Sequence, residues 1–258
     1  MIDCHAHLTS EAFNEDLVDV LKNAGEVGIN RIIVVSENLS DAKKALEICK
    51  SREDFLMPGA GFHPDLFSEE KSAPSEGEMT AFCDFVKDNS NNLACIGEVG
   101  LDYWYVESVE RRRMQADFLK RLVNLSLETD LPLNVHSRSA GKYALALLAE
   151  HGAKRVLMHG FDGKAGYALK AALEQGFLFS IPTSVVRSAQ KQKLVKTLPL
   201  AVMVLETDSP VLGPDKEKRN EPANLTYALE YIASAKKMTP EKIDEVTTEN
   251  AMRLFGIA

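Results

Sequence analysis

Ile2-Asp3-Cys4-His5-Ala6-His7-Leu8-Thr9 combines a short apolar strand with two histidines near its end. In a strand successive side chains alternate between two faces, so His5 and His7 are expected on one face and Cys4 on the other, toward a layer of helices. Open, doubly wound α/β sheets usually carry a Gly-rich phosphate loop after their first strand. Here two imidazoles occupy that place, which favours a different α/β fold and supplies half of a transition-metal site.

Beyond this stretch, apolar β-type runs alternate with segments of helical periodicity along the chain. Strands are expected at Ile2–Leu8, Arg31–Val35, Phe55–Ala60, Leu93–Ile96, Leu133–Val135, Arg155–Met158, Phe177–Ile181 and Val202–Leu205. Helices are expected at Glu11–Val27, Ser40–Lys50, Glu76–Asp88, Val109–Thr129, Ser139–Glu150, Lys164–Glu174, Val185–Lys196 and Asn224–Lys236. About eight βα units in about 250 residues favour a parallel sheet that closes into a (β/α)8 TIM-type barrel.

An additional C-terminal helix is expected over Pro240–Phe255, with Thr239 as its N-cap and Pro240 at its first position. No linker or low-complexity tract divides the chain, so residues 1–258 are expected to form a single barrel domain. The longest irregular stretch, Phe62–Gly77, follows the third strand. We expect it to form a mobile loop over the site.

The composition limits the classes of function. A net charge of -8 argues against a broad basic surface that coats nucleic acid, although metal ions in a pocket could still hold a phosphodiester locally. No window is apolar enough to span a bilayer, and because the predicted first strand begins at Ile2 we expect no cleavable presequence. The 4 cysteines lack paired spacing, which is typical of free thiols. We therefore expect an intracellular protein, cytoplasmic or nuclear, with no membrane association and no obligate protein partner.

Polar residues gather at the predicted carboxyl ends of the strands, which form the active-site face of such a barrel. A single histidine there is more often structural, and an isolated acid could cap the following helix. Their joint occurrence favours one shared metal site, because scattered structural histidines have no reason to meet at one end of a barrel. The residues at these ends are His5, His7, His63, Glu98, His136, Arg138, His159, Glu206 and Asp208.

Taken in order, these residues resemble the TatD family of metal-dependent deoxyribonucleases, within the amidohydrolase superfamily. Two positions depart from the family's usual pattern: Ser139, where the family often has an acid, and Asp162, where it often has Ser or Thr. The motifs that carry the resemblance cover nearly the whole chain: Asp3-x-His5-x-His7, Gly61-x-His63-Pro64, Gly97-Glu98-x-Gly100-Leu101-Asp102, His136-Ser137-Arg138, His159-Gly160-Phe161-x-Gly163, Glu206-Thr207-Asp208-Ser209-Pro210, Arg219-Asn220-Glu221-Pro222 and Asn250-Ala251.

The resemblance implies a barrel with a two-metal centre that binds zinc, manganese or magnesium. By position, one ion would be held by His5, His7 and Asp208, and the other by His136 and His159. Glu98 would bridge the two ions, while His63 and Arg138 would face the substrate phosphate. Members of the family are associated with 3′-to-5′ exonuclease and abasic-site endonuclease activity, so DNA bound locally at the metals is the expected substrate.

Two divalent ions that share a water lower its pKa and stabilise the charge that develops on a phosphodiester. Glu98 and Asp208 are the catalytic candidates, Asp208 because it could orient and deprotonate that water. Glu206 either orients a ligand imidazole or is a solvated or helix-capping acid. Arg138 either contacts phosphate or forms a surface salt bridge, and Arg219-Asn220-Glu221-Pro222 either positions the last loop or contacts substrate.

Two other classes of function remain open. A metal-dependent amidohydrolase or a tRNA deacylase would use the same water to attack a carbonyl carbon. Many dinuclear amidohydrolases bridge their metals with a carboxylated lysine, and the fourth strand here ends without a lysine. A non-catalytic metal-binding protein is disfavoured, because structural zinc sites are normally closed and rich in cysteine.

Overall fold

The computed structural model describes residues 1–257 and contains a sheet in which eight strands follow one another in chain order. Each strand pairs in parallel with the next, which confirms the barrel expected from the alternation of strands and helices. The strands are β1 (Ile2–Ala6), β2 (Arg31–Val34), β3 (Leu56–Ala60), β4 (Cys95–Gly100), β5 (Leu133–His136), β6 (Val156–Met158), β7 (Leu178–Pro182) and β8 (Met203–Glu206).

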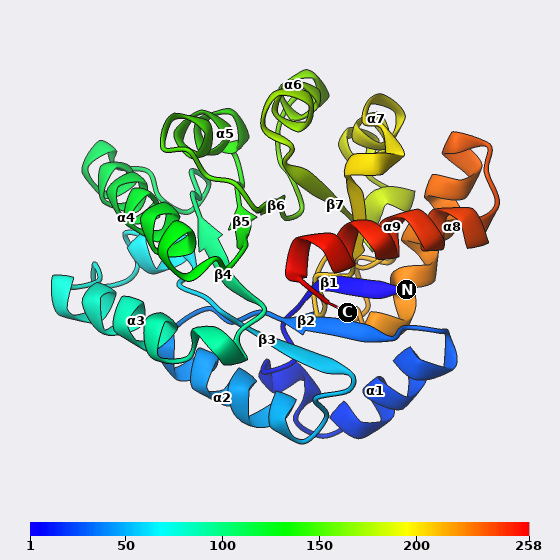
Figure 1. Cartoon of the computed structure of the whole chain (residues 1–258), viewed down its shortest axis with the longest axis horizontal. Coiled ribbons are helices and arrows are strands. Elements are labelled where there is room, and N and C mark those ends of the chain that lie inside the picture. The colour runs from blue at the N-terminus through cyan, green and yellow to red at the C-terminus, as the bar shows by residue number, and fades with distance from the viewer. Residues whose placement is uncertain (258) are drawn as a thin grey trace.

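Helices surround the strands, and the last helix covers one end of them (Figure 1). In Figure 1, α1 to α8 lie around the outside, while α9 crosses in front of the strands beside the N-terminus. No helix within residues 1–257 is both long and apolar enough to cross a membrane. The helices are α1 (Leu17–Glu26), α2 (Leu39–Lys50), α3 (Glu76–Asp88), α4 (Val109–Thr129), α5 (Gly141–Glu150), α6 (Ala165–Gln175), α7 (Ala189–Thr197), α8 (Leu225–Lys236) and α9 (Pro240–Phe255).

Helix α9 closes the amino end of the barrel. Its Ala251, Leu254 and Phe255 belong to an apolar cluster that also contains strand residues, among them Ile2 and Val204 near the strand starts. The Thr239 side chain accepts a hydrogen bond from Lys242 N, which confirms the predicted N-cap. Burial of this apolar face gives the barrel a closed base, so the opposite end is the one open to ligands.

Cys4 also belongs to this interior cluster, together with Cys95, rather than facing the helices as strict alternation predicts. In the pairing of β1 with β2, Asp3 lies opposite Ile32 and Ala6 opposite Val34, so three steps along β1 match two along β2. An extra residue of this kind is a β-bulge and breaks the alternation of side chains. The prediction for Cys4 was wrong because a bulge cannot be read from the spacing of the residues.

The barrel closes where the end of β8 meets the end of β1. Asp208 N donates to His5 O at 2.9 Å and His7 N donates to Ser209 O at 2.8 Å. The buried Asp3 carboxylate accepts from Thr207 N at 2.9 Å and from Thr207 Oγ1 at 2.6 Å. Burial raises the pKa of Asp3 to about 7. These bonds hold Asp208 beside the two histidines of the first strand.

Several elements differ from the prediction in their bounds, β4 and α1 among them. Strand β4 runs from Cys95 to Gly100, not Leu93–Ile96 as predicted, because its backbone pairs with β5 at Val99 and Gly100. Helix α1 begins at Leu17 rather than Glu11, after a 3₁₀ turn at Glu11–Phe13. Helices α5, α6, α7 and α8 also begin one to four residues later than predicted. Such boundaries depend on local capping contacts.

The segment Phe62–Gly77, expected to be mobile, is anchored to α4. It contains a 3₁₀ turn at Pro64–Phe67, and Gln115 Nε2 donates to Pro64 O at 2.7 Å. The guanidinium of Arg111 donates to Ser68 O at 2.6 Å and to Lys71 O at 3.0 Å. The sequence length of the segment gave no sign of these contacts. They make it a fixed wall beside the strand ends.

Glu69, in the same segment, holds the start of α4 from outside the helix. Its carboxylate accepts from Ser108 N at 3.0 Å and from Glu107 N at 3.1 Å, and these bonds lower the pKa of Glu69 to about 2. The Glu69 contribution to stability is therefore present above pH 4.5 and is lost as the pH falls toward 2.

We expect NMR titration of the Glu69 carboxyl to give a midpoint near 2, well below the ordinary 4.5. Glu69→Gln should speed amide hydrogen exchange at Glu107 and Ser108, because a neutral amide accepts their hydrogen bonds less strongly. Glu70→Gln, at the exposed neighbouring position, is the control and should change neither. An ordinary midpoint for Glu69 would contradict the capping role.

Candidate metal centre

His5 and His7 meet at the open end of the barrel with an acid from the last strand end. Their Nε2 atoms lie 3.2 Å apart. Asp208 Oδ1 lies 3.5 Å from His5 Nε2 and 3.4 Å from His7 Nε2. Donor atoms of these three buried residues all fall within 4.8 Å of one another, so the three could hold a metal ion. Residues 5 and 208 thus come together, as the sequence predicts.

Glu98 lies between this group and a second set of histidines. Its Oε2 is 3.3 Å from His5 Nε2 and 3.1 Å from His7 Nε2. Its Oε1 is 2.5 Å from His136 Nδ1 and 3.5 Å from His159 Nε2. One carboxylate oxygen therefore faces each half of the cluster, which is the arrangement that a bridging carboxylate requires.

His63 lies within the donor cluster, whereas the resemblance implies only that it faces the substrate phosphate. Its Nε2 is 3.4 Å from Glu98 Oε1, and His63, Glu98 and His136 form another group whose donor atoms lie within 4.8 Å of one another. On the other side of the ring, His63 Nδ1 is 2.9 Å from Asp65 Oδ1. The cluster thus contains five histidines and two acids, and all of them had been predicted from strand ends.

The outer nitrogens of two histidines are held by hydrogen-bonding side chains. Asn134 Nδ2 donates to Cys4 O at 3.0 Å, so its Oδ1 accepts from His5 Nδ1, also at 3.0 Å. This bond leaves the His5 Nε2 lone pair directed into the cluster. Asp102 Oδ2 lies 2.9 Å from His136 Nε2, so His136 presents Nδ1 to Glu98. Such partners fix the orientation of imidazoles that bind metals.

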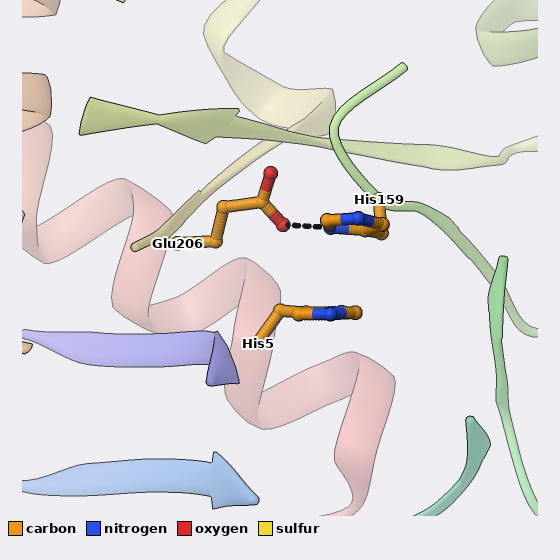
Figure 2. Close-up of side chains that lie close together, drawn as sticks. All are labelled: His5, His159 and Glu206. Carbon is orange, nitrogen blue, oxygen red and sulfur yellow. Dashed lines mark hydrogen bonds and ion pairs between the residues drawn. The ribbon is translucent and has the colours of Figure 1, made fainter. Parts of the chain in front are cut away.

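Glu206 plays the same part for His159 (Figure 2). Figure 2 shows its carboxylate directed at the His159 ring, with Oε2 2.8 Å from Nδ1, while the His5 ring stacks on His159 with centroids 3.6 Å apart. Oε1 of Glu206 accepts from Gly160 N at 2.9 Å. Because Glu206 is fully buried and both oxygens are bonded, it is neither a solvated acid nor a helix cap. It orients His159.

We expect Glu206→Gln to weaken metal affinity by about 10- to 100-fold, because a glutamine cannot accept from both His159 Nδ1 and Gly160 N. Competition with a chromophoric chelator measures this affinity directly. Glu150→Gln makes the same chemical change at an exposed position and should bind metal as the unmodified protein does. Unchanged affinity in Glu206→Gln, with an intact fold by circular dichroism, would contradict the orienting role.

The charge state of the cluster suits a divalent cation. Burial raises the pKa of Glu98, but the surrounding histidines outweigh this effect and hold it well below its usual range. Burial likewise raises the pKa of Asp208, and His159, His7 and His5 bring it below the ordinary value. Both carboxylates are therefore anionic at neutral pH. Mixed carboxylate and imidazole donors fit zinc, manganese or magnesium. In addition, the buried His7 Nδ1 lacks a hydrogen-bond partner within residues 1–257.

A cleft of about 530 Å³ opens above the cluster. Arg138 lines it, and its guanidinium lies 4.9 Å from the centroid of the Trp104 ring and 5.0 Å from that of Tyr105. Among the ion pairs of the described part of the chain, none involves Arg138, so the surface salt bridge considered from the sequence is not formed there. The guanidinium remains available to a ligand in the cleft.

Lys191 of α7 is a cleft residue that no sequence motif indicated. It is buried, and its Nζ donates to Gly160 O at 2.5 Å and to Phe161 O at 2.7 Å. These bonds fix the turn that follows His159. Burial lowers the pKa of Lys191. The residue lies within a helix far along the chain from that turn, so only the folded structure could identify it.

The two departures from the family pattern contact each other at the rim of the cleft. Ser139 N donates to Asp162 Oδ2 at 2.8 Å. The family often has an acid at the position of Ser139 and Ser or Thr at the position of Asp162. In this chain the acid and the hydroxyl residue have exchanged positions. Neither residue belongs to the donor cluster.

The motif Arg219-Asn220-Glu221-Pro222 positions the last loop, the first of the two roles considered for it. Arg219 Nη2 lies 2.5 Å from Asp16 Oδ2. The buried Asn220 donates through Nδ2 to Thr207 O and to Val211 O, each at 2.8 Å. These contacts flank Asp208 on both sides and hold the turn that carries it.

Comparisons with known proteins bear on the cluster. The family model described as "TatD related DNase" matches residues 2–256. The deoxyribonuclease TATDN3 of Homo sapiens is 40% identical over 99% of this chain and 94% of its own length. The uncharacterized metal-dependent hydrolase YabD of Bacillus subtilis is 32% identical over 100% of this chain and 99% of its own. The crystal structure of YjjV, a TatD homologue from Escherichia coli, superimposes with a TM-score of 0.89 at 22% identity, covering 100% of this chain and 98% of that one.

Proposed function

Because the chain belongs to the family of TatD-related DNases, which are metal-dependent hydrolases, we propose that it hydrolyses phosphodiester bonds of DNA at the histidine and carboxylate cluster. The observation that carries the proposal is the position of Glu98, whose two oxygens face different groups of histidines. A carboxylate in that position can serve two cations that act on one phosphate.

We assign His5, His7 and Asp208 to one divalent ion and His136 and His159 to the other, with Glu98 shared between them. Zinc, manganese or magnesium would supply an activated water and offset the charge that develops on the phosphodiester. In this proposal Glu206, Asn134 and Asp102 keep the imidazoles in the orientation that binding requires.

Asp208 acts on the attacking water. Its Oδ1 faces His7 Nε2 at 3.4 Å, while Oδ2 lies 3.9 Å from His159 Nε2 and makes fewer contacts. An anionic carboxylate with one less engaged oxygen can accept a proton there, so Oδ2 would receive the proton of the water as its oxygen bonds to phosphorus. The P–O bond to the leaving sugar oxygen breaks in the same displacement, and that oxygen takes a proton from solvent. The phosphate itself is held by Arg138, which can donate two parallel hydrogen bonds, and by His63 at the edge of the cluster.

We expect Arg138→Ala to raise KM for a phosphodiester substrate by about 10- to 100-fold, the effect of losing a charged hydrogen bond to phosphate. The rate constant kcat should change much less, since Arg138 lies outside the donor cluster. Steady-state kinetics separate the two parameters. Arg113→Ala removes an exposed arginine from α4 and is the control. A KM unchanged by Arg138→Ala would argue against a phosphate contact.

The experiment that tests the function compares substrates for metal-free protein reloaded with manganese, zinc or magnesium. The panel contains 3′-labelled single-stranded DNA, a duplex with an abasic site, cyclic amides and an aminoacyl-tRNA. We expect the metal-loaded protein to cleave DNA, with activity lost in chelator and restored by metal. The products distinguish exonuclease from endonuclease cleavage. Hydrolysis of an amide or an aminoacyl ester without DNA cleavage would instead establish the amidohydrolase or deacylase alternative. Loss of the signal in Asp208→Asn excludes a contaminating nuclease.

A further inference from the structure

The loop between β4 and α4 presents two adjacent aromatic rings to solvent beside the cluster. The side chain of Trp104 is 61% exposed and that of Tyr105 is 48% exposed. Tyr105 lines the same cleft as Glu98 and His136. Large aromatic side chains bury much apolar area when they are covered, so an exposed pair at the mouth of a cleft indicates a surface that a ligand covers.

The backbone beneath these rings is fixed to the cluster. Asp102 Oδ1 accepts from Trp104 N at 2.7 Å and from Tyr105 N at 2.8 Å, while its other oxygen contacts His136. From α4, Arg112 donates to Tyr103 O at 3.1 Å and to Val106 O at 2.7 Å. The rings are thus held at a set place relative to the reacting phosphate. A pre-organised surface loses less conformational entropy when it binds.

Arg138 joins the two rings to the phosphate site. Its guanidinium lies 4.9 Å from the Trp104 centroid and 5.0 Å from the Tyr105 centroid, a separation typical of cation–π contact. This contact orients the arginine over the cleft without using a carboxylate. A nucleotide offers a phosphate and a flat base close together, so phosphate bound by Arg138 would bring the attached base toward the rings.

The negative net charge of the protein favours base stacking over electrostatic contact with the DNA backbone. A net charge of -8 argues against a broad basic surface of the kind that follows a sugar–phosphate backbone. Stacking of bases on aromatic rings needs no positive charge and tolerates any sequence. In a duplex the bases already stack on one another and are not available to the protein.

The wall opposite the rings is apolar. Pro210, Val211 and Leu212, which follow β8, line the cleft, and the Val211 side chain is 55% exposed. In an eight-stranded barrel the loops after the fourth and eighth strands face each other across the open end. An unpaired base attached to the phosphate at the cluster would therefore contact aromatic side chains on one side and aliphatic ones on the other.

We propose that Trp104 and Tyr105 form a stacking platform for the nucleobase attached to the phosphate that Arg138 holds, a binding site outside the donor cluster. The inference rests on the proposed function and specifies its substrate.

Trp104 is the only tryptophan in the chain, so intrinsic fluorescence reports on the platform alone. The Asp208→Asn protein in magnesium is titrated with a single-stranded DNA hexanucleotide, with an abasic hexamer of equal charge, and with inorganic phosphate. We expect the hexanucleotide to quench Trp104, and the abasic hexamer and phosphate to leave the emission unchanged. Equal quenching by the abasic hexamer, or binding seen by polarisation with no quenching, would overturn the proposal.

Substitutions give a second measurement. Trp104→Ala and Tyr105→Ala should each weaken binding of the hexanucleotide about tenfold, and Trp104→Phe should restore most of the affinity because it keeps a ring. Binding of the abasic hexamer should not change. Tyr227→Ala removes a ring that is 45% exposed on α8 and is the control. In wild-type protein kcat/KM should be higher for single strands than for blunt duplex, and both platform variants should reduce this preference.

The two proposals fail in different ways. If the wild-type protein cleaves DNA while Trp104→Ala and Tyr105→Ala keep their KM and strand preference, the platform is wrong and the function stands. If the wild-type protein cleaves no DNA but the quenching still depends on bases, the phosphodiesterase function is wrong and the nucleobase site stands.

Discussion

Glu98→Gln is expected to reduce hydrolysis of DNA by about a thousandfold or more, since it removes the residue assigned to both metal ions. Glutamine keeps the shape of the side chain but carries no charge and only one oxygen. It would present an amide nitrogen to one of the two histidine groups that the carboxylate oxygens now face. Both ions should therefore bind more weakly, and elemental analysis of the purified variant should show less than the wild-type metal content.

Initial rates on 3′-labelled single-stranded DNA measure the loss, at several metal concentrations to separate weaker binding from slower chemistry. Glu110→Gln, at the exposed start of α4, is the matched control and should retain full activity. Circular dichroism and thermal unfolding establish that the Glu98 variant is folded. Near-normal turnover in a folded Glu98→Gln protein would show that the carboxylate does not join the two ions.

Asp208→Asn is expected to lower kcat by a similar factor, about a thousandfold, but for a different reason. Asp208 has a backbone φ of 57°, in the left-handed region, and asparagine adopts that conformation more readily than other substitutes. The substitution should therefore keep the turn after β8 while it removes the proton acceptor and one donor to the first ion. The ion assigned to His136 and His159 should remain.

Metal content distinguishes the two variants. Asp208→Asn should retain about half of the metal of the wild-type protein if one of two ions is kept, whereas Glu98→Gln should affect both. Asp208→Ala provides a comparison, because alanine in the left-handed region adds backbone strain that lowers stability as well as activity. If Asp208→Asn turned over DNA at the wild-type rate, a different residue would have to accept the proton.

The sequence predicted the fold because each βα unit shows its own periodicity. Helices α3, α4 and α9 begin and end at the predicted residues, since their amphipathic faces and their Ser or Thr caps are local signals. Strand β4 was predicted at Leu93–Ile96 rather than Cys95–Gly100, because its pairing with β5 at Val99 and Gly100 depends on a distant strand. Features that neighbouring strands decide, such as the bulge in β1, lie outside what a local pattern contains.

The donor cluster was predictable for a related reason. Parallel strands in a barrel all end on one face, so a residue after one strand is near a residue after another whatever their separation in the chain. Asn134 and Lys191 could not be found in this way. Asn134 lies within β5 and Lys191 lies within α7, and each acts through a hydrogen bond whose partner is fixed only by the tertiary structure.

The closure of the barrel between its first and last strands has a consequence for how the protein is made. His5 and His7 are translated long before Asp208, and the bonds from Thr207 to Asp3 join residues that are 204 positions apart. A nascent or prematurely terminated polypeptide therefore lacks the complete set of donors. Whatever reaction the centre performs therefore requires synthesis to have passed Asp208, and a polypeptide that stops before it cannot assemble the site.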